Sequence, residues 1–315
     1  MAYYTKINKL EFKKYLKNYS FGDLYYFKGI NEGIENTNYF FKTKYNKYVL
    51  TIYENKITER IKEKNLSFFI DLVNFLRKRK FPCPKILYDN NNKQLNFHKK
   101  KQYTIIDFVE GKIAKKINFQ HCYKLGRTLA TLHKKTLNFE KKKKNNFSLN
   151  EWDKLIKRKI KLSKKESFFL KKEIKYIKEN WPKKLPKGII HGDLFPDNVF
   201  FKNNNIVGII DLSNACNDFF CYDLSICINA WCYENRLNID KMKNLIKGYN
   251  SIRKIKNEEI NYLNLFLRAS SLRFYLSRLM DSQNKKIPKK YKKNPKEYLK
   301  KLKYFQVNDV NNYFL

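Results

Sequence analysis

Residues 188–211 read GIIHGDLFPDNVFFKNNNIVGIID, and this stretch decides how the chain folds. A short apolar run enters a polar loop, and two β-like runs follow it, Val199–Phe201 and Ile206–Ile210. Three asparagines join the two runs and tolerate positive φ, so the pattern predicts a hairpin. With a two-residue turn at the last two asparagines, Asn198 is expected to lie opposite Asp211 at the open end.

Asp193 lies in the loop that leads into the hairpin. Two carboxylates and one carboxamide are therefore expected together at the open end of the hairpin. Phosphoryl transfer needs such a set, because Mg²⁺ is held by few protein oxygens and a base accepts the proton of the attacking hydroxyl. We therefore expect Asn198 and Asp211 to bind the metal and Asp193 to act as catalytic base. The spacing matches a kinase catalytic loop, although Leu212-Ser213 follows where protein kinases have Phe-Gly. The alternative is an ordinary hairpin with polar ends.

The segment 188–233 resembles the aminoglycoside and choline kinase superfamily, and within it the bacterial homoserine kinases that share this fold. The likeness rests on HGDLFPDNVFF, GIID, ACND at 215–218, YDL at 222–224 and CINAWC at 227–232, with GIENTNYF at 33–40 near the start. It implies ATP- and Mg²⁺-dependent phosphorylation of L-homoserine to O-phospho-L-homoserine, on the route to threonine. Other members of the superfamily phosphorylate choline, aminoglycosides or sugars, and these acceptors remain alternatives.

The resemblance implies an α+β, bilobal protein-kinase-like fold. The N-terminal nucleotide-binding lobe, residues 1–106, would hold an antiparallel sheet and a helix. The larger, mostly helical lobe, residues 107–315, would hold the catalytic and acceptor groups. Apolar periodicity predicts strands over 24–27, 39–43, 48–53, 86–88, 95–97 and 103–106, helices over 8–19, 66–79, 119–135, 150–162, 166–180, 223–233, 240–250, 257–282 and 294–299, and a polar loop over 214–223.

The nucleotide side of the site is expected in the N-terminal lobe. Gly33 begins a turn between two predicted strands, and Thr37 and Asn38 form the polar pair found in this loop of related kinases. The backbone N–H groups of such a turn can lie over phosphates, although a plain hairpin fits it as well. Ile106 and Phe108 flank the start of the expected hinge, whose backbone would bind adenine.

The third predicted strand departs from the protein-kinase pattern. Thr51 stands where protein kinases keep a lysine that pairs with the phosphates. Lys56 is a nearby cation, and Glu59 and Glu63 are candidates for the glutamate that usually pairs with the strand lysine. The residues leave open which cation meets the phosphates.

Three arginines, Arg268, Arg273 and Arg278, recur at intervals of five in the predicted helix 257–282. Arginine binds a carboxylate through two parallel hydrogen bonds, and an amino-acid acceptor carries such a group. Arg273 or Arg278 is therefore a candidate for binding the acceptor, with a structural ion pair as the alternative.

Two histidines and two aspartates near the motif have structural interpretations. His133 is expected to be a structural histidine at a helix end, and His191 to brace the loop without acting as the base. Asp218 and Asp223 are expected to be structural caps, with Asp223 at the start of the helix 223–233, and metal binding is the alternative for both.

The chain of 315 residues carries 68 Lys and Arg against 29 Asp and Glu, a formal charge of +39. The lysines are spread along the whole chain and mixed with Asn, Ile, Tyr and Phe, residues that share AT-rich codons. Codon bias therefore explains the charge without a nucleic-acid partner, and no zinc-finger or RNA-binding motif points to one. A non-catalytic basic binding protein on a kinase fold is the alternative from another functional class, but all three catalytic candidates are present.

The remaining features point to a cytoplasmic enzyme. No apolar run is long enough to span a bilayer, and the first residues lack the apolar core of a signal peptide. The six cysteines do not follow a zinc-binding spacing, so we expect them to be reduced and buried. The oligomeric state cannot be read from the sequence.

Overall fold

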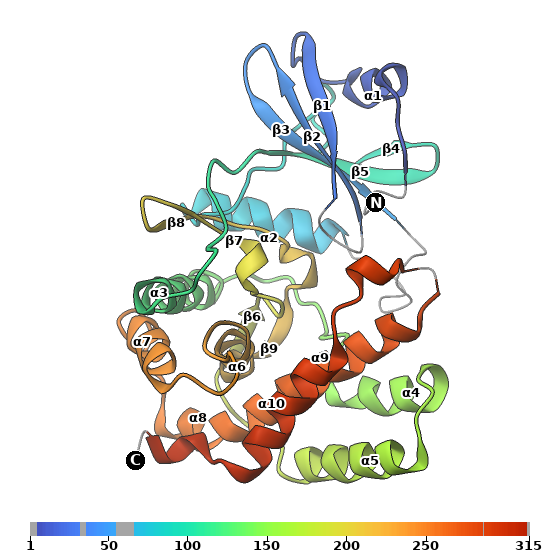
Figure 1. Cartoon of the computed structure of the whole chain (residues 1–315). Helices are drawn as coiled ribbons and strands as arrows, with labels where there is room; N and C mark the ends of the chain where they lie inside the picture. Colours follow the sequence, from blue (N-terminus) through green and yellow to red (C-terminus); the bar gives the residue numbers. More distant parts are fainter. Residues whose placement is uncertain (1–4, 32–35, 55–65, 286, 314–315) are drawn as a thin grey trace. The chain divides into compact units, whose positions relative to one another are not determined.

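The computed structural model describes residues 5–31, 36–54, 66–285 and 287–313. The chain divides into two units (Figure 1): residues 1–110 with 286–291, and residues 111–285 with 292–315. The first unit carries an antiparallel sheet, and the second is mostly helical. The predicted α+β class is confirmed.

The first unit is built on a five-stranded sheet in the order β1-β2-β3-β5-β4, with every neighbouring pair antiparallel. The predicted strand 86–88 makes only a single bridge, between Ile86 and Ile106. The elements of this unit are α1 (Lys9–Leu16), β1 (Leu24–Ile30), β2 (Asn36–Thr43), β3 (Lys47–Tyr53), α2 (Leu66–Lys78), β4 (Asn96–His98) and β5 (Lys101–Asp107).

An aromatic cluster joins α1 to the sheet. The ring of Phe12, which is fully buried, lies 4.7 Å from the ring of Phe27, 5.7 Å from that of Tyr39 and 5.3 Å from that of Phe41. Asn8 caps the helix by accepting a hydrogen bond from the N–H of Glu11. The sequence therefore forms this short helix with one aromatic face toward the strands.

The second unit holds most of the helices and two small sheets, in which β6 pairs with β9 and β7 with β8. The prediction of a polar loop over 214–223 is wrong, because β9 and the first turn of α6 occupy it. The elements are α3 (Phe119–Lys135), α4 (Leu149–Lys159), α5 (Lys164–Glu179), β6 (Lys187–Ile190), β7 (Val199–Lys202), β8 (Asn205–Ile209), β9 (Cys216–Phe219), α6 (Phe220–Trp231), α7 (Ile239–Asn250), α8 (Asn257–Asn261), α9 (Leu263–Gln283) and α10 (Pro295–Val307).

Capping residues explain where several of these helices begin. Asn118 and Ser163 start α3 and α5 with capping boxes, which satisfy backbone N–H groups at the helix N-terminus. Asn294 caps α10, and Pro295 follows at its first position, where no N–H is needed. These signals are local, so the starts of α3 and α5 lie close to the predicted ones, whereas α10 continues well beyond residue 299.

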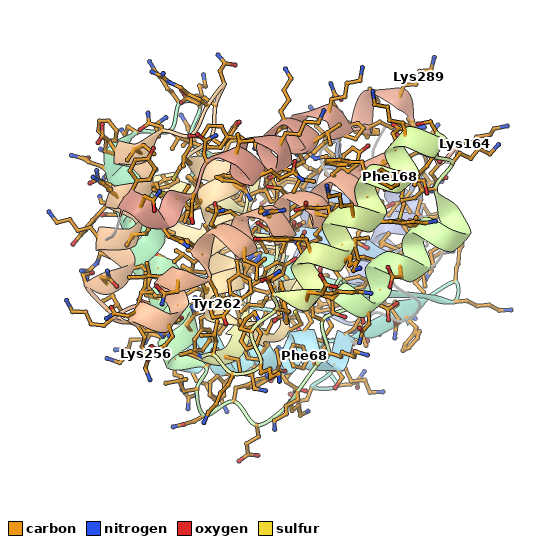
Figure 2. The ribbon with its side chains drawn as sticks, turned by 90° about the horizontal axis from the view of Figure 1, so that it is seen from below. Phe68, Lys164, Phe168, Lys256, Tyr262 and Lys289 are labelled. Atoms are coloured by element: carbon orange, nitrogen blue, oxygen red, sulfur yellow. The ribbon has the colours of Figure 1, made fainter. Side chains whose placement is uncertain are left out.

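Many lysine side chains lie on the outside of the structure, whereas the cysteines lie in its interior. Figure 2 shows lysine side chains reaching outward around the ribbon, with the exposed Lys164 and Lys256 among those labelled. All six cysteines are buried and unpaired, as predicted. None of the described helices combines the length and apolar character needed to cross a bilayer.

Candidate active site

The loop 191–198 follows directly from β6. Ile189 and Ile190 are buried, which fixes the end of the strand in the interior. Gly192 then has a φ of +73°, a backbone conformation that favours glycine, so the chain can turn sharply at this point. Pro196–Asn198 form one turn of 3-10 helix that leads into β7.

The hairpin after this loop has a different register from the predicted one. Asn203 and Asn204 have φ values of +48° and +59°, so the turn lies one residue earlier than expected. The N–H of Ile210 donates to the carbonyl oxygen of Asn198 over 3.0 Å, so the predicted pairing of Asn198 with Asp211 is wrong. Three consecutive asparagines all tolerate positive φ, which is why the sequence alone did not locate the turn.

The structure still brings Asn198 and Asp211 to adjacent strand ends, because Asp211 follows Ile210 directly. Asp211 has a φ of +60°, is exposed, and accepts a hydrogen bond of 2.6 Å from the hydroxyl of Ser213. Nδ2 of Asn198 donates to the carbonyl oxygen of Asp193 over 2.8 Å. That bond turns the amide oxygen of Asn198 away from the same carbonyl.

The backbone of Asp193 is held from both ends of the loop. Its carbonyl oxygen also accepts the N–H of Phe195 at 2.9 Å, and its own N–H lies 3.3 Å from Nδ1 of His191. Nε2 of His191 lies 3.0 Å from the carbonyl oxygen of Ile210. These two contacts fit the neutral imidazole protonated at Nε2. His191 therefore braces the loop against the end of β8, as predicted.

Asp223 anchors the start of the loop. One of its carboxylate oxygens accepts the N–H of His191 at 2.8 Å, and the other accepts the N–H of Gly192 at 2.9 Å. Asp223 is fully buried, so its charge needs these hydrogen bonds. Burial alone would raise the pKa of Asp223, but the hydrogen bonds from His133 and from the loop N–H groups lower it below the usual range.

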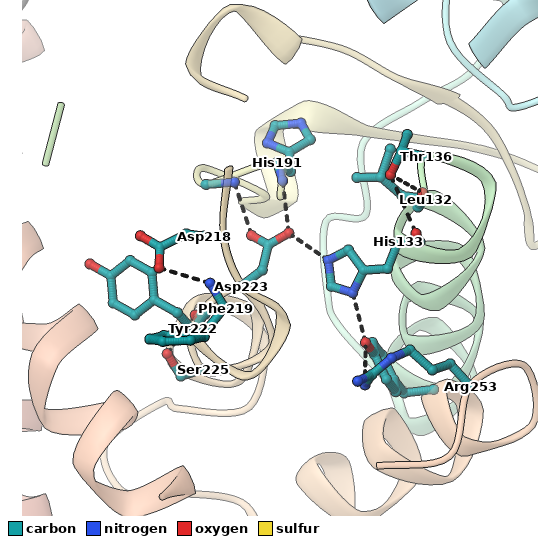
Figure 3. Close-up of polar contacts among 12 residues, drawn as sticks. Leu132, His133, Thr136, His191, Asp218, Phe219, Tyr222, Asp223, Ser225 and Arg253 are labelled. Carbon is teal, nitrogen blue, oxygen red and sulfur yellow. Dashed lines mark hydrogen bonds and ion pairs between the residues drawn. The ribbon is translucent and has the colours of Figure 1, made fainter. Parts of the chain in front are cut away.

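A buried chain of polar groups extends from Asp223 to α7 and α8 (Figure 3). Nε2 of His133 lies 3.1 Å from Asp223, and its Nδ1 lies 2.7 Å from the hydroxyl of Tyr249. Arg253 donates to that hydroxyl at 3.1 Å and pairs with Glu259 at 2.8 Å. His133 is fully buried, and burial lowers its pKa. The prediction that His133 is structural is confirmed.

The role of Asp223 differs from the predicted helix cap. α6 begins at Phe220, so Asp223 lies inside its first turn and binds the N–H groups of another segment. The sequence held one signal for this, because Asp223 is the only charged residue in the run 219–233. A carboxylate within an apolar helix is stable only when other segments supply its donors.

Of the candidate arginines, only Arg273 reaches the loop 191–198. Its guanidinium donates to the carbonyl oxygen of Gly192 at 2.5 Å. Arg278 instead pairs with Glu297 at 2.5 Å, and Arg268 forms two bonds to Glu173, of 2.8 and 2.7 Å. The structural ion pair, which was the alternative for Arg273 and Arg278, therefore applies to Arg278, and Arg268 forms one as well.

In the first unit, Thr37 and Asn38 are both engaged within the sheet. Thr37 is fully buried, and its hydroxyl donates to Glu54 at 2.7 Å. The amide oxygen of Asn38 accepts a bond of 2.8 Å from the hydroxyl of Thr51, the residue at the expected lysine position. The side chain of Thr37 therefore supports β2 and does not point outward as a phosphate ligand would.

Ile106 and Phe108 lie at the end of β5. Ile106 is paired with Val49 of β3, and the N–H of Phe108 donates to the carbonyl oxygen of Lys47 at 3.1 Å. The remaining candidates of this region, Gly33, Lys56, Glu59 and Glu63, lie outside the described residues. Within the part of the chain that is described, no three His, Cys, Asp or Glu side chains come together in a metal-binding group.

Comparison with known sequences gives relatives over most of the chain. The sequence pattern of the phosphotransferase enzyme family matches residues 27–252. A homoserine kinase of Bartonella henselae is 40% identical over 287 residues, covering 89% of both chains. A homoserine kinase of Rhizobium meliloti is also 40% identical, over 89% of this chain and 87% of its own.

Comparison with solved structures gives similar folds at low identity. An amicoumacin kinase solved with AMP-PNP and Ca²⁺ has a TM-score of 0.73 at 13% identity, covering 98% of this chain and 94% of its own. A microcompartment-associated aminopropanol kinase has a TM-score of 0.70 at 14% identity, covering 95% and 94%.

Proposed function

Since the chain belongs to the phosphotransferase enzyme family and, within it, to the homoserine kinases, we propose that it transfers the γ-phosphoryl group of ATP to the hydroxyl of L-homoserine. The product would be O-phospho-L-homoserine, an intermediate on the route to threonine. The observation that carries the chemistry is the meeting of Asp193, Asn198 and Asp211 around the open end of the β7–β8 hairpin. The observation that favours this acceptor is the identity to homoserine kinases over most of the chain.

In this mechanism Asp193 is the catalytic base. The hydroxyl oxygen of the acceptor attacks the γ-phosphorus of ATP, the bond from that phosphorus to the β,γ-bridging oxygen breaks, and ADP leaves. The proton of the hydroxyl passes to the carboxylate of Asp193. Asp223 and His191 keep the loop in one conformation, so the carboxylate is positioned before the substrates bind.

The donor groups at the hairpin end fit Mg²⁺. The ion prefers oxygen ligands, takes only one or two carboxylates from the protein, and keeps phosphate oxygens and water as its other ligands. Asn198 and Asp211 supply an amide oxygen and a carboxylate on adjacent strand ends, and these two residues would hold it. Held there, Mg²⁺ would supply positive charge against the phosphate oxygens of ATP.

We assign nucleotide binding to the first unit and catalysis and acceptor binding to the second, with the boundary near Asp107. The segment from Gly33 to Asn38, which includes the first residues of β2, would contact the phosphates through its backbone, with the buried Thr37 as its support. The backbone around Ile106 and Phe108 would bind adenine. ATP use agrees with the family, and a biosynthetic kinase of this kind would work in the cytoplasm.

ADP release tests this function directly. The purified protein would be assayed with Mg-ATP against L-homoserine, choline, kanamycin, methylthioribose and L-threonine. Turnover with L-homoserine alone is expected. Strong turnover with another acceptor would keep the catalytic residues and discard homoserine. An absence of turnover with all five, together with salt-dependent binding to nucleic acid, would favour a basic binding protein.

A further inference from the structure

A small cavity in the second unit has the chemistry to bind one end of an amino acid. Its volume is about 260 Å³. That volume can take a small amino acid. The lining residues are Asn145, Phe147, Ser148, Leu149, Asn150, Trp152, Trp181, Asp218 and Tyr222.

The carboxylate of Asp218 lacks a counter-ion within the described residues. It accepts the side-chain amide of Asn145 at 2.6 Å and the backbone N–H of Phe219 at 2.8 Å. These neutral donors leave further acceptor positions on a carboxylate. Burial raises the pKa of Asp218, and the two hydrogen bonds and the charge of Arg273 offset that rise only in part. A cationic ligand group would supply the missing charge.

Two hydroxyls that line the same cavity also lack partners in the described part of the chain. Tyr222 is almost fully buried, and its hydroxyl makes no hydrogen bond. The hydroxyl of Ser148 is buried and unpaired in the same way. Figure 3 shows the Asp218 carboxylate beside the Tyr222 ring, on the other side of Asp223 from His133. Buried hydroxyls without partners are costly, and several around one cavity indicate a polar ligand.

Arg273 connects this cavity to the loop 191–198. Its guanidinium lies 4.5 Å from the centre of the Phe147 ring, which forms one wall. The same group donates to the carbonyl oxygen of Gly192, the residue before the proposed base. Nε of Arg273 is buried and has no partner among the described residues, although the side chain carries a full charge. An anionic ligand group at this end would pair with it.

We propose that this cavity is the part of the acceptor site that recognises the amino-acid end of the substrate. Asp218 binds the α-ammonium group with Tyr222 and Ser148 around it, and Arg273 binds the α-carboxylate. This assignment rests on the proposed function. It makes Asp218 a specificity-determining residue, because acceptors that lack an ammonium group leave its carboxylate without a paired cation.

The test compares acceptors that each lack one end group. L-homoserine, 4-hydroxybutanoate (without the ammonium) and 3-aminopropan-1-ol (without the carboxylate) are assayed with wild type, Asp218→Asn and Arg273→Lys. For L-homoserine, Asp218→Asn is expected to lower kcat/KM about 10- to 100-fold, mainly through KM, as for a lost charged hydrogen bond. For 4-hydroxybutanoate the change is expected to stay within about twofold, because that interaction is not made. Asp240→Asn, the same change at an exposed site on α7, is the control. It is expected to leave the ratios of kcat/KM between the three acceptors unchanged.

Arg273→Lys is expected to reduce the preference for L-homoserine over 3-aminopropan-1-ol. Equal losses with all three acceptors, in either variant, would overturn the assignment and leave a structural role. If Asp218→Asn does not fold, the assignment is tested with Tyr222→Phe and with inhibitors that compete with L-homoserine for the wild-type enzyme. L-2-aminobutyrate, which has both end groups and no hydroxyl, is expected to compete with L-homoserine, whereas butanoate is not. Equal inhibition by the two would also overturn it.

The experiment distinguishes a failure of the proposed function from a failure of the cavity assignment. Wild-type turnover of L-homoserine with unchanged acceptor ratios in the variants overturns only the cavity assignment. A wild type that does not phosphorylate L-homoserine overturns the proposed function and, with it, this assignment.

Discussion

At the scale of single residues, the geometry of the loop 191–198 depends on a few buried hydrogen bonds. Asp223 binds the first two N–H groups of the loop, and Asn198 binds the carbonyl oxygen of Asp193. Hydrogen bonds to a charged, buried acceptor are the stronger kind, so they hold the backbone closely. The proposed base is therefore positioned by residues that do not touch the reacting atoms.

Replacing Asp193 tests the assignment of the base. Asp193→Asn keeps the size of the side chain and the hydrogen bonds of the backbone, but the amide cannot accept the proton of the hydroxyl. We expect kcat to fall roughly 10²–10⁴-fold, the usual range for a lost general base. Circular dichroism and Mg-ATP binding should stay unchanged. The matched control is Asp197→Asn, an exposed aspartate of the same loop that pairs with Lys293, and its activity should stay within about twofold. Near-wild-type turnover of Asp193→Asn would exclude the role.

The buried His133 predicts a pH dependence of stability. Burial lowers its pKa below the ordinary 6.5, so the folded protein keeps the ring neutral while the unfolded chain takes up a proton as the pH falls through 6.5. The unfolded state then binds more protons, and the free energy of unfolding falls with decreasing pH, by at most about 1.4 kcal/mol per pH unit. The charged and titratable groups near this ring are Asp223, Tyr249, Arg253 and Glu259.

Urea unfolding at pH 7.5 and pH 5.5 measures this effect. His133→Gln removes the titrating ring, so the stability gap between wild type and variant should narrow at pH 5.5. The raised pKa values of Asp107 and Asp218 increase the free energy of unfolding as the pH falls, which is opposite to the effect of His133. Both aspartates are present in wild type and variant, so their effect cancels in the difference in stability between the two proteins. Lys134→Ala, an exposed change on the same helix, should keep the wild-type slope. A gap that widens on acidification would show that His133 is protonated in the folded state.

At the scale of elements, two helices approach so closely that only glycine fits. A Cβ placed on Gly126 of α3 would lie 2.0 Å from the carbonyl oxygen of Leu245, and one on Gly248 of α7 would lie 2.0 Å from that of Tyr123. The contacted atoms are backbone, so no side chain can move to make room. This contact also places His133 on α3 beside Tyr249 on α7, which completes the chain of polar groups to Asp223.

We expect Gly126→Ala to destabilise the second unit by about 1–3 kcal/mol or more, because the helices must move apart. The higher helix propensity of alanine would offset at most about 1 kcal/mol of this. Urea denaturation followed by circular dichroism measures the change. Lys134→Ala, on the exposed face of the same helix, should remain within about 0.5 kcal/mol of wild type. A stabilised Gly126→Ala variant would contradict the close packing.

At the scale of the whole molecule, the dominant property is the formal charge of +39. The lysines are spread over many elements and reach outward, as Figure 2 shows. Such a surface attracts anions in general, ATP and nucleic acid included, without selecting among them. The charge therefore favours weak, non-specific association and does not by itself define a partner.

We expect an oligonucleotide to bind at about 50 mM salt and to be released by about 200 mM, with no preference for sequence, because counterion release drives such binding. Fluorescence anisotropy with an oligo-dT and an oligo-dA of equal length measures it. We expect the protein to turn over L-homoserine at the higher salt, where the oligonucleotide is released. Catalysis would then not need this binding. A sequence preference that persists at 200 mM would instead indicate a specific nucleic-acid site.

Features that depend on local patterns could be predicted from the order of the amino acids. The protein-kinase-like class expected from the resemblance is confirmed by the solved structures of similar fold. The helix over 119–135 has the predicted bounds, because a capping residue and apolar periodicity mark it within one segment. The catalytic candidates could be named for the same reason, since Asp193, Asn198 and Asp211 lie within one short motif.

Contacts between segments that are distant in the sequence are visible only in the folded chain. Local periodicity records that a face is buried but not what lies against it, so Asp223 was read as a cap although it binds the loop at Gly192. The same limit applied to Arg273 and Arg278, which are alike in sequence, because among the described residues Arg278 pairs with a glutamate and Arg273 does not. The cavity beside Asp218 is lined by residues from 145 to 222, and this grouping exists only once the chain has folded.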